Sequence, residues 1–326
     1  METYFEAKPG LINKSAIALG FFDGVHPGHK AVIQTCVEDA KRLDIKSGVV
    51  TFKDHPRTLT RGRSPLLLTV IEQRLELIEC LKVDFALVLS FTEELCLLSP
   101  REYVEQVLVG ALGAKSISVG HNHHFGRHRE GNARLLAQLG KELDFTVNVA
   151  RMIKVDDCEV SSSKIREFIE NGEMAKARHL LERPFSIRGV VAHGDGRGKT
   201  IGFPTANLDV YEYQMLPKRG VYAGIAILEK GERKGCVINV GLRPTFKSSI
   251  SALVIEAHIF NHDRDIYGEN LEIEFLDFIR DEKKFDGRES LVEQIEKDKQ
   301  KAIQYLDKAG FQPEKNNQEK EEKLHA

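Results

Sequence analysis

The chain has 326 residues, of which 41% are hydrophobic and 29% charged, the usual composition of a globular protein with a core. Its length exceeds that of a typical single domain and therefore predicts two. The 47 basic and 49 acidic side chains leave a net charge of −2. No global basic field therefore favours nucleic acid or an anionic membrane surface.

The five cysteines are an odd number, lie far apart and never have CxxC spacing. This pattern predicts neither a zinc knuckle nor a disulfide framework. The first residues, METYFEAKPG, do not resemble a signal peptide, and no apolar run is long enough to span a membrane. We therefore expect a cytoplasmic protein with no nucleic-acid or membrane partner.

Up to about Leu181, short apolar runs alternate with amphipathic helical patterns. Such alternation predicts a parallel sheet with helices on both faces. Capping boxes predict two helix starts, one at Thr69 with Glu72 and one at Ser99 with Glu102. The expected strands are Ala16–Leu19, Gly48–Phe52, Phe85–Leu89, Ser116–Val119 and Phe145–Val149.

After Arg183 and Pro184 the pattern changes to short strands punctuated by glycine. Several strands at short spacing with few helices predict an antiparallel barrel or sandwich. The expected strands are Phe185–Ala192, Val221–Leu228, Lys234–Val240, Leu253–Phe260 and Leu271–Phe278.

A final amphipathic helix is predicted from Asp286, boxed with Glu289, and the polar residues after about Pro313 have the composition of a disordered tail. We therefore expect one domain over 1–183, a second over 184–310 and a charged tail over 311–326.

Residues 18–30, ALGFFDGVHPGHK, form an apolar run, a glycine turn and the start of a helical pattern. A strand that turns on glycine into a helix aims backbone N–H groups at one point, which suits a polyphosphate. His26 and His29 flank that point, Gly28 allows close backbone approach, and Pro27 suits a helix start. Without a ligand, the same segment is a βα loop that happens to contain two histidines.

Two further loops follow strands of the predicted sheet. VVTFKDHP ends a strand at Phe52 and then carries His55 and Pro56, which we expect at the same sheet edge as His26. GHNHHFGRHREGN, residues 120–132, offers four histidines as metal ligands. Because its arginines would repel a cation, we favour a loop that wraps a ligand with Asn122 and Phe125.

The segment VSSSKIR, residues 160–166, opens a helix. One serine is explained by capping, but Lys164 and Arg166 in the first turn oppose the helix dipole. A bound phosphate would offset that penalty by accepting bonds from the serine hydroxyls and from Arg166.

HPGH together with SSSKIR resembles the nucleotidyltransferase superfamily. LGFFDGVHPGH, VVTFKDHP and GHNHHFG…EGN resemble the FMN adenylyltransferase half of bacterial bifunctional riboflavin kinase/FAD synthetases. The resemblance implies a Rossmann-like nucleotidyltransferase domain that transfers AMP from ATP to the FMN phosphate and releases pyrophosphate.

The resemblance also implies roles for single residues. His26 and His29 would contact the ATP phosphates, and Arg166 with Ser162 or Ser163 the leaving pyrophosphate. The remaining nucleotide contacts would come from Gly20, Phe21, Asp23 and Gly28, and the flavin contacts from Phe52, His55, Pro56, Asn122 and Phe125. The sequence departs from the family at Ser163, where threonine is usual, and at His121 and His123, where acidic or aromatic residues are common.

In the second half, VVAHGDGRGKTIGFPTANL carries Gly194, Gly196, Gly198 and Gly202 but lacks the spacing of a P-loop. Thr205 and Asn207 stand two residues apart, so in an extended segment they would project to one side and suit Mg²⁺ and phosphate oxygens. A plain glycine-rich hairpin is the alternative.

The strand LVIEAHIF alternates, with Glu256 and His258 on one face between Val254 and Phe260. The face is either the wet side of a strand or a partly enclosed surface on which a carboxylate acts as a base.

GDGRGKTIGFPTAN, NVGLRPTF, DIYG and FIRDEKKFDG resemble the riboflavin kinase module of the same family, with Leu242 in place of a usual threonine. The resemblance implies an antiparallel β-barrel with a terminal helix. Glu256 would be the general base, Thr205 and Asn207 would hold Mg²⁺, and Arg280 would contact flavin or close the site. The nucleotide contacts would come from Gly194, Gly196, Gly198, Lys199 and Asn207.

The sequence thus predicts a cytoplasmic two-domain enzyme, a monomer or weak homo-oligomer, that uses ATP, riboflavin and FMN. Two alternatives stay open. One is an adenylyltransferase with a flavin-sensing barrel, against which the PTAN segment and Glu256 argue. The other is a flavin-binding or nucleic-acid-interacting protein without catalysis, whose nucleic-acid version the balanced charge disfavours.

Overall fold

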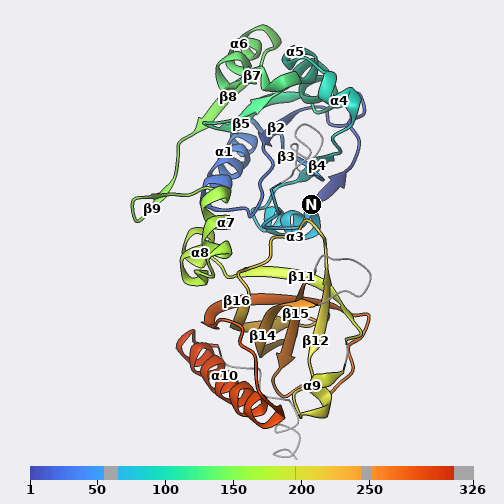
Figure 1. Ribbon diagram of the computed structural model, residues 1–326. Coiled ribbons are helices and arrows are strands. Elements are labelled where there is room, and N and C mark those ends of the chain that lie inside the picture. Colours follow the sequence, from blue (N-terminus) through green and yellow to red (C-terminus); the bar gives the residue numbers. More distant parts are fainter. Residues whose placement is uncertain (55–64, 195, 244–251, 312–326) are drawn as a thin grey trace, which may run out of the picture. The chain divides into compact units, whose positions relative to one another are not determined.

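The computed structural model describes residues 1–54, 65–194, 196–243 and 252–311 (Figure 1). His55, Pro56 and the charged tail from residue 312 lie outside these ranges. The chain divides into two compact units, which we call unit 1 (1–164 with 180–182) and unit 2 (165–179 with 183–326). The boundaries at residues 183 and 310 stay predictions.

Unit 1 is built on a six-stranded parallel sheet in the order β1-β4-β3-β2-β5-β8. Five strands confirm the expected ones to within two residues at each end, and the edge strand β1 had no sequence prediction. The strands are β1 (Glu2–Tyr4), β2 (Ser15–Leu19), β3 (Lys46–Phe52), β4 (Phe85–Leu89), β5 (Ala114–Gly120) and β8 (Thr146–Ala150).

Helices cover both faces of this sheet, as the sequence predicts. On one face, Ile33 of α1 (Pro27–Leu43) and Ile78 of α3 (Ile71–Glu79) pack on β2 and β3. On the other, Leu108 of the π-helix η1 (Val104–Ala111) and Leu136 of α6 (Ala133–Leu143) complete a second apolar core. The sheet is therefore buried on both sides, which explains its continuous apolar strands.

One of the two predicted capping boxes in unit 1 is confirmed and the other is wrong. Ser99 caps α5 (Pro100–Tyr103) and Glu102 reciprocates. Helix α3 instead begins at Ile71 with no side-chain cap. Thr69 is unavailable because its hydroxyl bonds to the buried carboxylate of Asp23 at 3.2 Å and accepts from the Gly24 N–H at 3.0 Å.

The smaller elements of unit 1 follow the strand ends. They are α4 (Glu93–Leu97), β6 (His124–Phe125), the 3₁₀ turn η2 (Arg127–Arg129), β7 (Gly131–Asn132), β9 (Lys154–Val155) and β10 (Cys158–Glu159). Helices α7 (Ser162–Glu170) and α8 (Met174–Leu181) follow, and the division between the units falls within them.

Unit 2 is a closed six-stranded barrel in the order β11-β12-β15-β14-β13-β16, and all its pairs are antiparallel. Closure removes the sheet edges, which settles the choice between barrel and sandwich. The strands are β11 (Phe185–Ala192), β12 (Ala206–Val210), β13 (Gly220–Ile227), β14 (Arg233–Arg243), β15 (Ala252–Ile259) and β16 (Asn270–Arg280). The sequence predicts all but β12.

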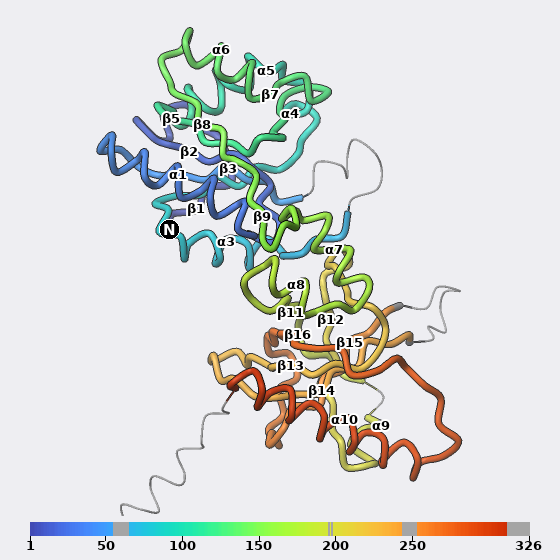
Figure 2. Tube along the Cα trace, turned by 90° about the vertical axis from the view of Figure 1, so that its left-hand side faces the viewer, coloured from blue at the N-terminus to red at the C-terminus, as the bar shows by residue number. Residues whose placement is uncertain are grey.

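The terminal helix α10 (Arg288–Lys308) packs on β13, β14 and β16 outside the barrel (Figure 2). Its Ala302 and Leu306 are buried against the barrel strands. The box predicted at Asp286 is wrong, because α10 begins after Gly287 with no side-chain cap. No helix within the described ranges is long and apolar enough to cross a membrane.

Candidate active sites

The first candidate site lies at the carboxyl edge of the unit 1 sheet. On one side of β2 the sheet continues with β3 and then β4. The next strand in the chain, β5, lies on the other side of β2. In parallel sheets a ligand binds where the strand order reverses, in the crevice beyond the strand ends. The loop from Gly20 to His26 leaves β2 at this point, so the predicted histidine turn stands where the strand order reverses.

His26 and His29 form the centre of this edge. His26 is the residue before α1 and His29 is in its first turn, and their rings stack with centroids 3.6 Å apart. Phe22 meets His29 edge-on at 5.4 Å. A Cβ on Gly28 would lie 3.2 Å from the His26 ring, so glycine leaves the room that this pair occupies. The sequence prediction that both histidines share one place is confirmed by this geometry.

The turn before α1 holds an unusual backbone. Phe22, Gly24 and Val25 all have positive φ, at 55°, 81° and 38°. Such conformations are costly for side-chain-bearing residues and persist only where the surroundings enforce them. Asp23 supplies that enforcement, because its buried carboxylate accepts the Leu68 and Thr69 N–H groups at 3.0 and 2.9 Å. Its carboxylate shapes the turn, and its predicted nucleotide contact stays a prediction.

Arg74, which sequence reasoning missed, braces the same turn. Its fully buried guanidinium donates to the carbonyls of Phe52 at 2.8 Å and Thr69 at 3.2 Å and lies 4.1 Å from the Phe21 ring centre. Burial lowers the pKa of Arg74 to about 10, so it stays charged at neutral pH. The sequence did carry a signal for its burial: Arg74 stands four residues before Ile78, on the apolar face of the predicted helix.

The serine-rich helix start meets the histidine turn within unit 1. Ser161 accepts the Lys164 N–H at 3.3 Å as an N-cap, and the Ser162 hydroxyl donates to the Asp23 carbonyl at 3.0 Å. Ser161 and Ser162 thus both have structural roles. Ser163 is the next residue of α7, and Arg166 lies beyond the point where the chain passes into unit 2.

The residues predicted to contact flavin have different surroundings in the structure. The Phe52 ring packs against Phe91 with centroids 4.4 Å apart and a tilt of 33°, and the backbone carbonyl of Asn122 accepts a bond from His124 Nδ1 at 3.0 Å. Phe125 is 7% exposed and belongs to the core, which leaves little of its ring for a ligand. Within the described ranges, the histidines of this loop form no group of three or more metal-ligating side chains.

His123 is the exception among those histidines because it is half-buried and its Nε2 atom is shielded from solvent. It packs parallel to Phe125 at 5.8 Å, and its Nε2 has no hydrogen-bond partner among the described residues. Burial, with smaller contributions from His124 and Arg129, lowers the pKa of His123 to about 4. The ring is therefore neutral at physiological pH and acts as an aromatic packing group.

A cavity of about 600 Å³ in unit 1 lies elsewhere, between α5 and α6. Its walls include Arg101, Glu130 and Glu142, and no predicted site residue lines it. We therefore place the candidate site at the strand ends rather than in this cavity.

The second candidate site is a row of side chains across the outer face of the unit 2 barrel. Residues paired directly across antiparallel strands project to the same face. Glu256 on β15 is paired with Asn207 on β12 and with Asn239 on β14. The row continues through Val221 on β13 to Arg280 on β16. Ile255 and Ala257 point into the barrel and are fully buried, so Glu256 faces outward.

Asn239 is the polar member of this row that sequence reasoning missed. It belongs to the quoted NVGLRPTF segment, but nothing in its spacing separates it from a structural asparagine. Only the β14–β15 register sets it beside Glu256.

The glycine-rich loop packs against the Asn207 end of the row. A Cβ on Gly194 would lie 2.3 Å from the Asn207 amide nitrogen, and one on Gly198 would lie 3.4 Å from the Thr205 hydroxyl. Gly196 has φ of 69° and precedes the short helix α9 (Arg197–Thr200), on which Lys199 is exposed. The structure therefore brings the loop glycines and the PTAN segment together.

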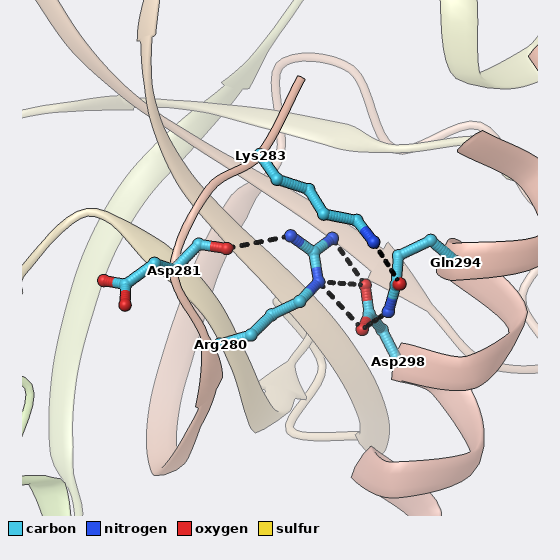
Figure 3. A network of polar contacts seen from close by, with 5 residues as sticks. All are labelled: Arg280, Asp281, Lys283, Gln294 and Asp298. Atoms are coloured by element: carbon cyan, nitrogen blue, oxygen red, sulfur yellow. Dashed lines mark hydrogen bonds and ion pairs between the residues drawn. The ribbon is translucent and has the colours of Figure 1, made fainter. Parts of the chain in front are cut away.

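Arg280, at the far end of the row, is held by the terminal helix (Figure 3). Its guanidinium makes three hydrogen bonds of 2.7–3.0 Å to the Asp298 carboxylate and a fourth of 2.9 Å to the Asp281 carbonyl. Gln294 also donates to Asp298, at 2.9 Å. Arg280 thus fastens α10 to the barrel, and its predicted flavin contact stays a prediction.

The two halves of the chain match different family models. Residues 9–164 match the model described as FAD synthetase, and residues 181–306 match the model described as riboflavin kinase. A bifunctional riboflavin kinase/FMN adenylyltransferase of Bacillus subtilis is 38% identical and covers 90% of this chain and 93% of its own length. The Listeria monocytogenes protein of that name is 39% identical over 89% of this chain and 91% of its own.

A solved structure from Streptococcus pneumoniae, titled a macrolide-efflux protein, is also similar. Its TM-score is 0.82 at 29% sequence identity, over 92% of this chain and 98% of that one. With both units matched nearly end to end by models and relatives of one kind, this chain belongs to the bifunctional riboflavin kinase/FMN adenylyltransferase family.

Proposed function

We propose that this chain makes FAD from riboflavin in two ATP-dependent steps, with the kinase in residues 184–310 and the adenylyltransferase in residues 1–183. The observation that carries the proposal is that each unit has its own glycine-bearing turn beside polar side chains: His26 and His29 in unit 1, and Glu256 with Asn207 in unit 2.

In the kinase step, the terminal ribityl hydroxyl of riboflavin attacks the γ-phosphorus of ATP. A new O–P bond forms, the bond from the γ-phosphorus to the bridging oxygen breaks, and ADP leaves. Glu256 is the general base that takes the hydroxyl proton, and a positioned carboxylate of this kind contributes about 10²–10⁴-fold to rate. Asn239, beside Glu256 in the row, orients that hydroxyl.

Thr205 and Asn207 would hold Mg²⁺ through a hydroxyl and an amide oxygen. Hard oxygen donors suit this ion, which is usually bound by few protein ligands plus substrate phosphates. The residues fit this ion, because the β12–β15 register sets Asn207 beside Glu256 and the backbone of Gly194 and Gly198 lies close to Asn207 and Thr205. When bound, Mg²⁺ neutralises charge on the transferred phosphoryl group. Gly194, Gly196, Gly198 and Lys199 contact the nucleotide phosphates.

In the adenylyl step, an oxygen of the FMN phosphate attacks the α-phosphorus of ATP, the bond between the α-phosphorus and the bridging oxygen to the β-phosphorus breaks, and pyrophosphate leaves. No covalent protein intermediate is needed, so positioning and charge stabilisation do the catalytic work. His26 and His29 bond to the triphosphate, and Ser163 and Arg166 to the departing pyrophosphate. Phe52 and Asn122 contact the flavin. A cytoplasmic location and a monomeric or weakly associating chain stay predictions from the sequence.

A product assay tests the proposal. Purified protein is incubated with riboflavin and ATP, with Mg²⁺ or with EDTA, and flavins are separated by chromatography over time. We expect FMN first and FAD later with Mg²⁺, and neither with EDTA. Conversion of supplied FMN but not of riboflavin would favour an adenylyltransferase with a sensing barrel. Flavin binding without ATP consumption would favour a binding protein.

A further inference from the structure

His258 stands two residues after Glu256 on β15 and shares its outer face. The ring is half-buried, and its Nδ1 lies 2.8 Å from the carbonyl oxygen of Pro204. Because a carbonyl oxygen can only accept, Nδ1 must carry the proton and donate it. The histidine therefore ties the strand that carries Glu256 to the segment that carries Thr205 and Asn207.

This bond occurs where the β-ladder stops. β12 and β15 are paired from Leu208 with Ile255 back to Ala206 with Ala257, and the register goes no further. Pro204 has no N–H and cannot donate to another rung. The side chain of His258 supplies a hydrogen bond between the two segments at this point. The Phe203 ring meets the His258 ring edge-on, with centroids 5.3 Å apart.

The glycine loop holds the same segment from its other side. The Phe203 N–H donates to the Gly198 carbonyl at 2.9 Å, and a Cβ on Gly198 would lie only 2.3 Å from the Phe203 carbonyl oxygen. Residues 203–205 are thus bonded to the loop through Phe203 and to β15 through Pro204. The β12 ladder begins only at Ala206, so without the His258 bond the backbone before Thr205 is held by the Phe203 bond alone.

The surroundings of His258 keep this arrangement over a wide pH range. Burial lowers the pKa of His258, and the nearby charged groups are Glu296 and Lys299 of α10, whose effects oppose each other. Phe260 on β15 packs against the ring at 5.9 Å. The neutral ring donates through Nδ1, and a protonated ring keeps that N–H.

We propose that His258 is a positioning residue of the kinase site: its Nδ1–H to the Pro204 carbonyl fixes the backbone just before Thr205, so that the Thr205 hydroxyl stays in place for Mg·ATP beside Asn207 and Glu256, which the β12–β15 ladder holds. This inference rests on the proposed kinase function. It concerns the nucleotide side of the site and not the riboflavin side.

Two variants of the full-length protein separate this role from packing. His258→Phe keeps an aromatic ring but removes the donor, whereas His258→Asn loses the ring but keeps an amide N–H near the position of Nδ1. His262→Phe makes the same chemical change at another histidine of unit 2 and is the matched control. Riboflavin phosphorylation is measured against Mg·ATP and against riboflavin, and FMN adenylylation is measured in the same preparations.

In His258→Phe we expect the KM for Mg·ATP to rise about tenfold, as loss of one well-placed hydrogen bond does, with the riboflavin KM within roughly twofold of the unmutated protein. His258→Asn should recover most of that loss, and His262→Phe should match the unmutated protein. Equal losses in the Phe and Asn variants, or equal rises of both KM values, would overturn the positioning role. Failure of the unmutated protein to phosphorylate riboflavin would instead overturn the proposed function.

Discussion

In unit 1 the polar side chains stand on loops at the carboxyl ends of parallel strands, whereas in unit 2 they stand on the faces of neighbouring antiparallel strands. Loops need bracing, and Asp23 and Arg74 provide it through buried bonds to backbone groups. The barrel needs no such bracing for Glu256, because the ladders on both sides of β15 already fix it. The comparison teaches that a loop-based site depends on buried polar supports, and a strand-based site on register.

The two sites should also fail separately, and Glu256→Gln is the sharpest way to separate them. We expect riboflavin phosphorylation to fall about 10³-fold, because the amide cannot accept the hydroxyl proton. Conversion of supplied FMN to FAD should be unchanged. Initial rates of both reactions on one preparation are the measurement, and Glu212→Gln, an exposed loop residue, is the control. Loss of both reactions in a folded variant would contradict the division between the units.

His29→Ala is the converse change. We expect FAD formation from FMN to fall about 10²-fold or more, because a donor to the charge on the triphosphate is lost. FMN formation from riboflavin is the control for unit 2, and the thermal unfolding curve is the control for the fold of unit 1. If FAD formation persisted at half its rate or better, the stacked histidine pair would have a structural role only.

Asp298→Ala tests how the barrel depends on its terminal helix. Asp298 is 1% exposed, and its loss leaves the Arg280 guanidinium without its carboxylate. Removing one partner of a buried ion pair lowers the free energy of unfolding by about 3 kcal/mol or more. We therefore expect a lower unfolding temperature for unit 2. Calorimetry measures the unfolding temperature. FMN adenylylation, measured on the same preparation, reports on unit 1. Asp307→Ala, near the end of the same helix, should leave the transition in place.

Protonation of His123 should give a smaller effect, confined to acid and to unit 1. The pKa of this ring falls from 6.5 to about 4 on folding, so the unfolded chain binds the proton more readily. Stability contributed by the neutral ring is complete above pH 6.5 and declines as the pH falls towards 4, by roughly 3 kcal/mol at most. Urea unfolding at several pH values measures the slope.

His123→Phe is the matched variant for that slope. Phenylalanine keeps a planar ring on Phe125 and has no proton to bind, so the part of the acid destabilisation due to His123 should disappear. An unchanged pH slope would mean that other groups cause it.

Local sequence patterns were enough to predict most of the strands and one helix start of this protein. Apolar alternation located ten strands, and the Ser99–Glu102 box located a helix start, because these depend on neighbours within a few residues. The glycine turn before His26 and the two-residue spacing of Thr205 and Asn207 in an extended segment could also be read from the sequence, since chain geometry imposes them.

Only the tertiary structure decided what depended on distant partners. Thr69 failed as a cap because Asp23, 46 residues away, takes its hydroxyl. Arg280 was drawn to Asp298, and Asn239 reached Glu256 only through barrel register. Strand β12 escaped prediction because its short run, ANLDV, carries two polar residues, and only its pairing with β11 and β15 makes it a strand. A hydrogen-bonding side chain takes whichever partner folding brings near, and sequence order carries little information about that choice.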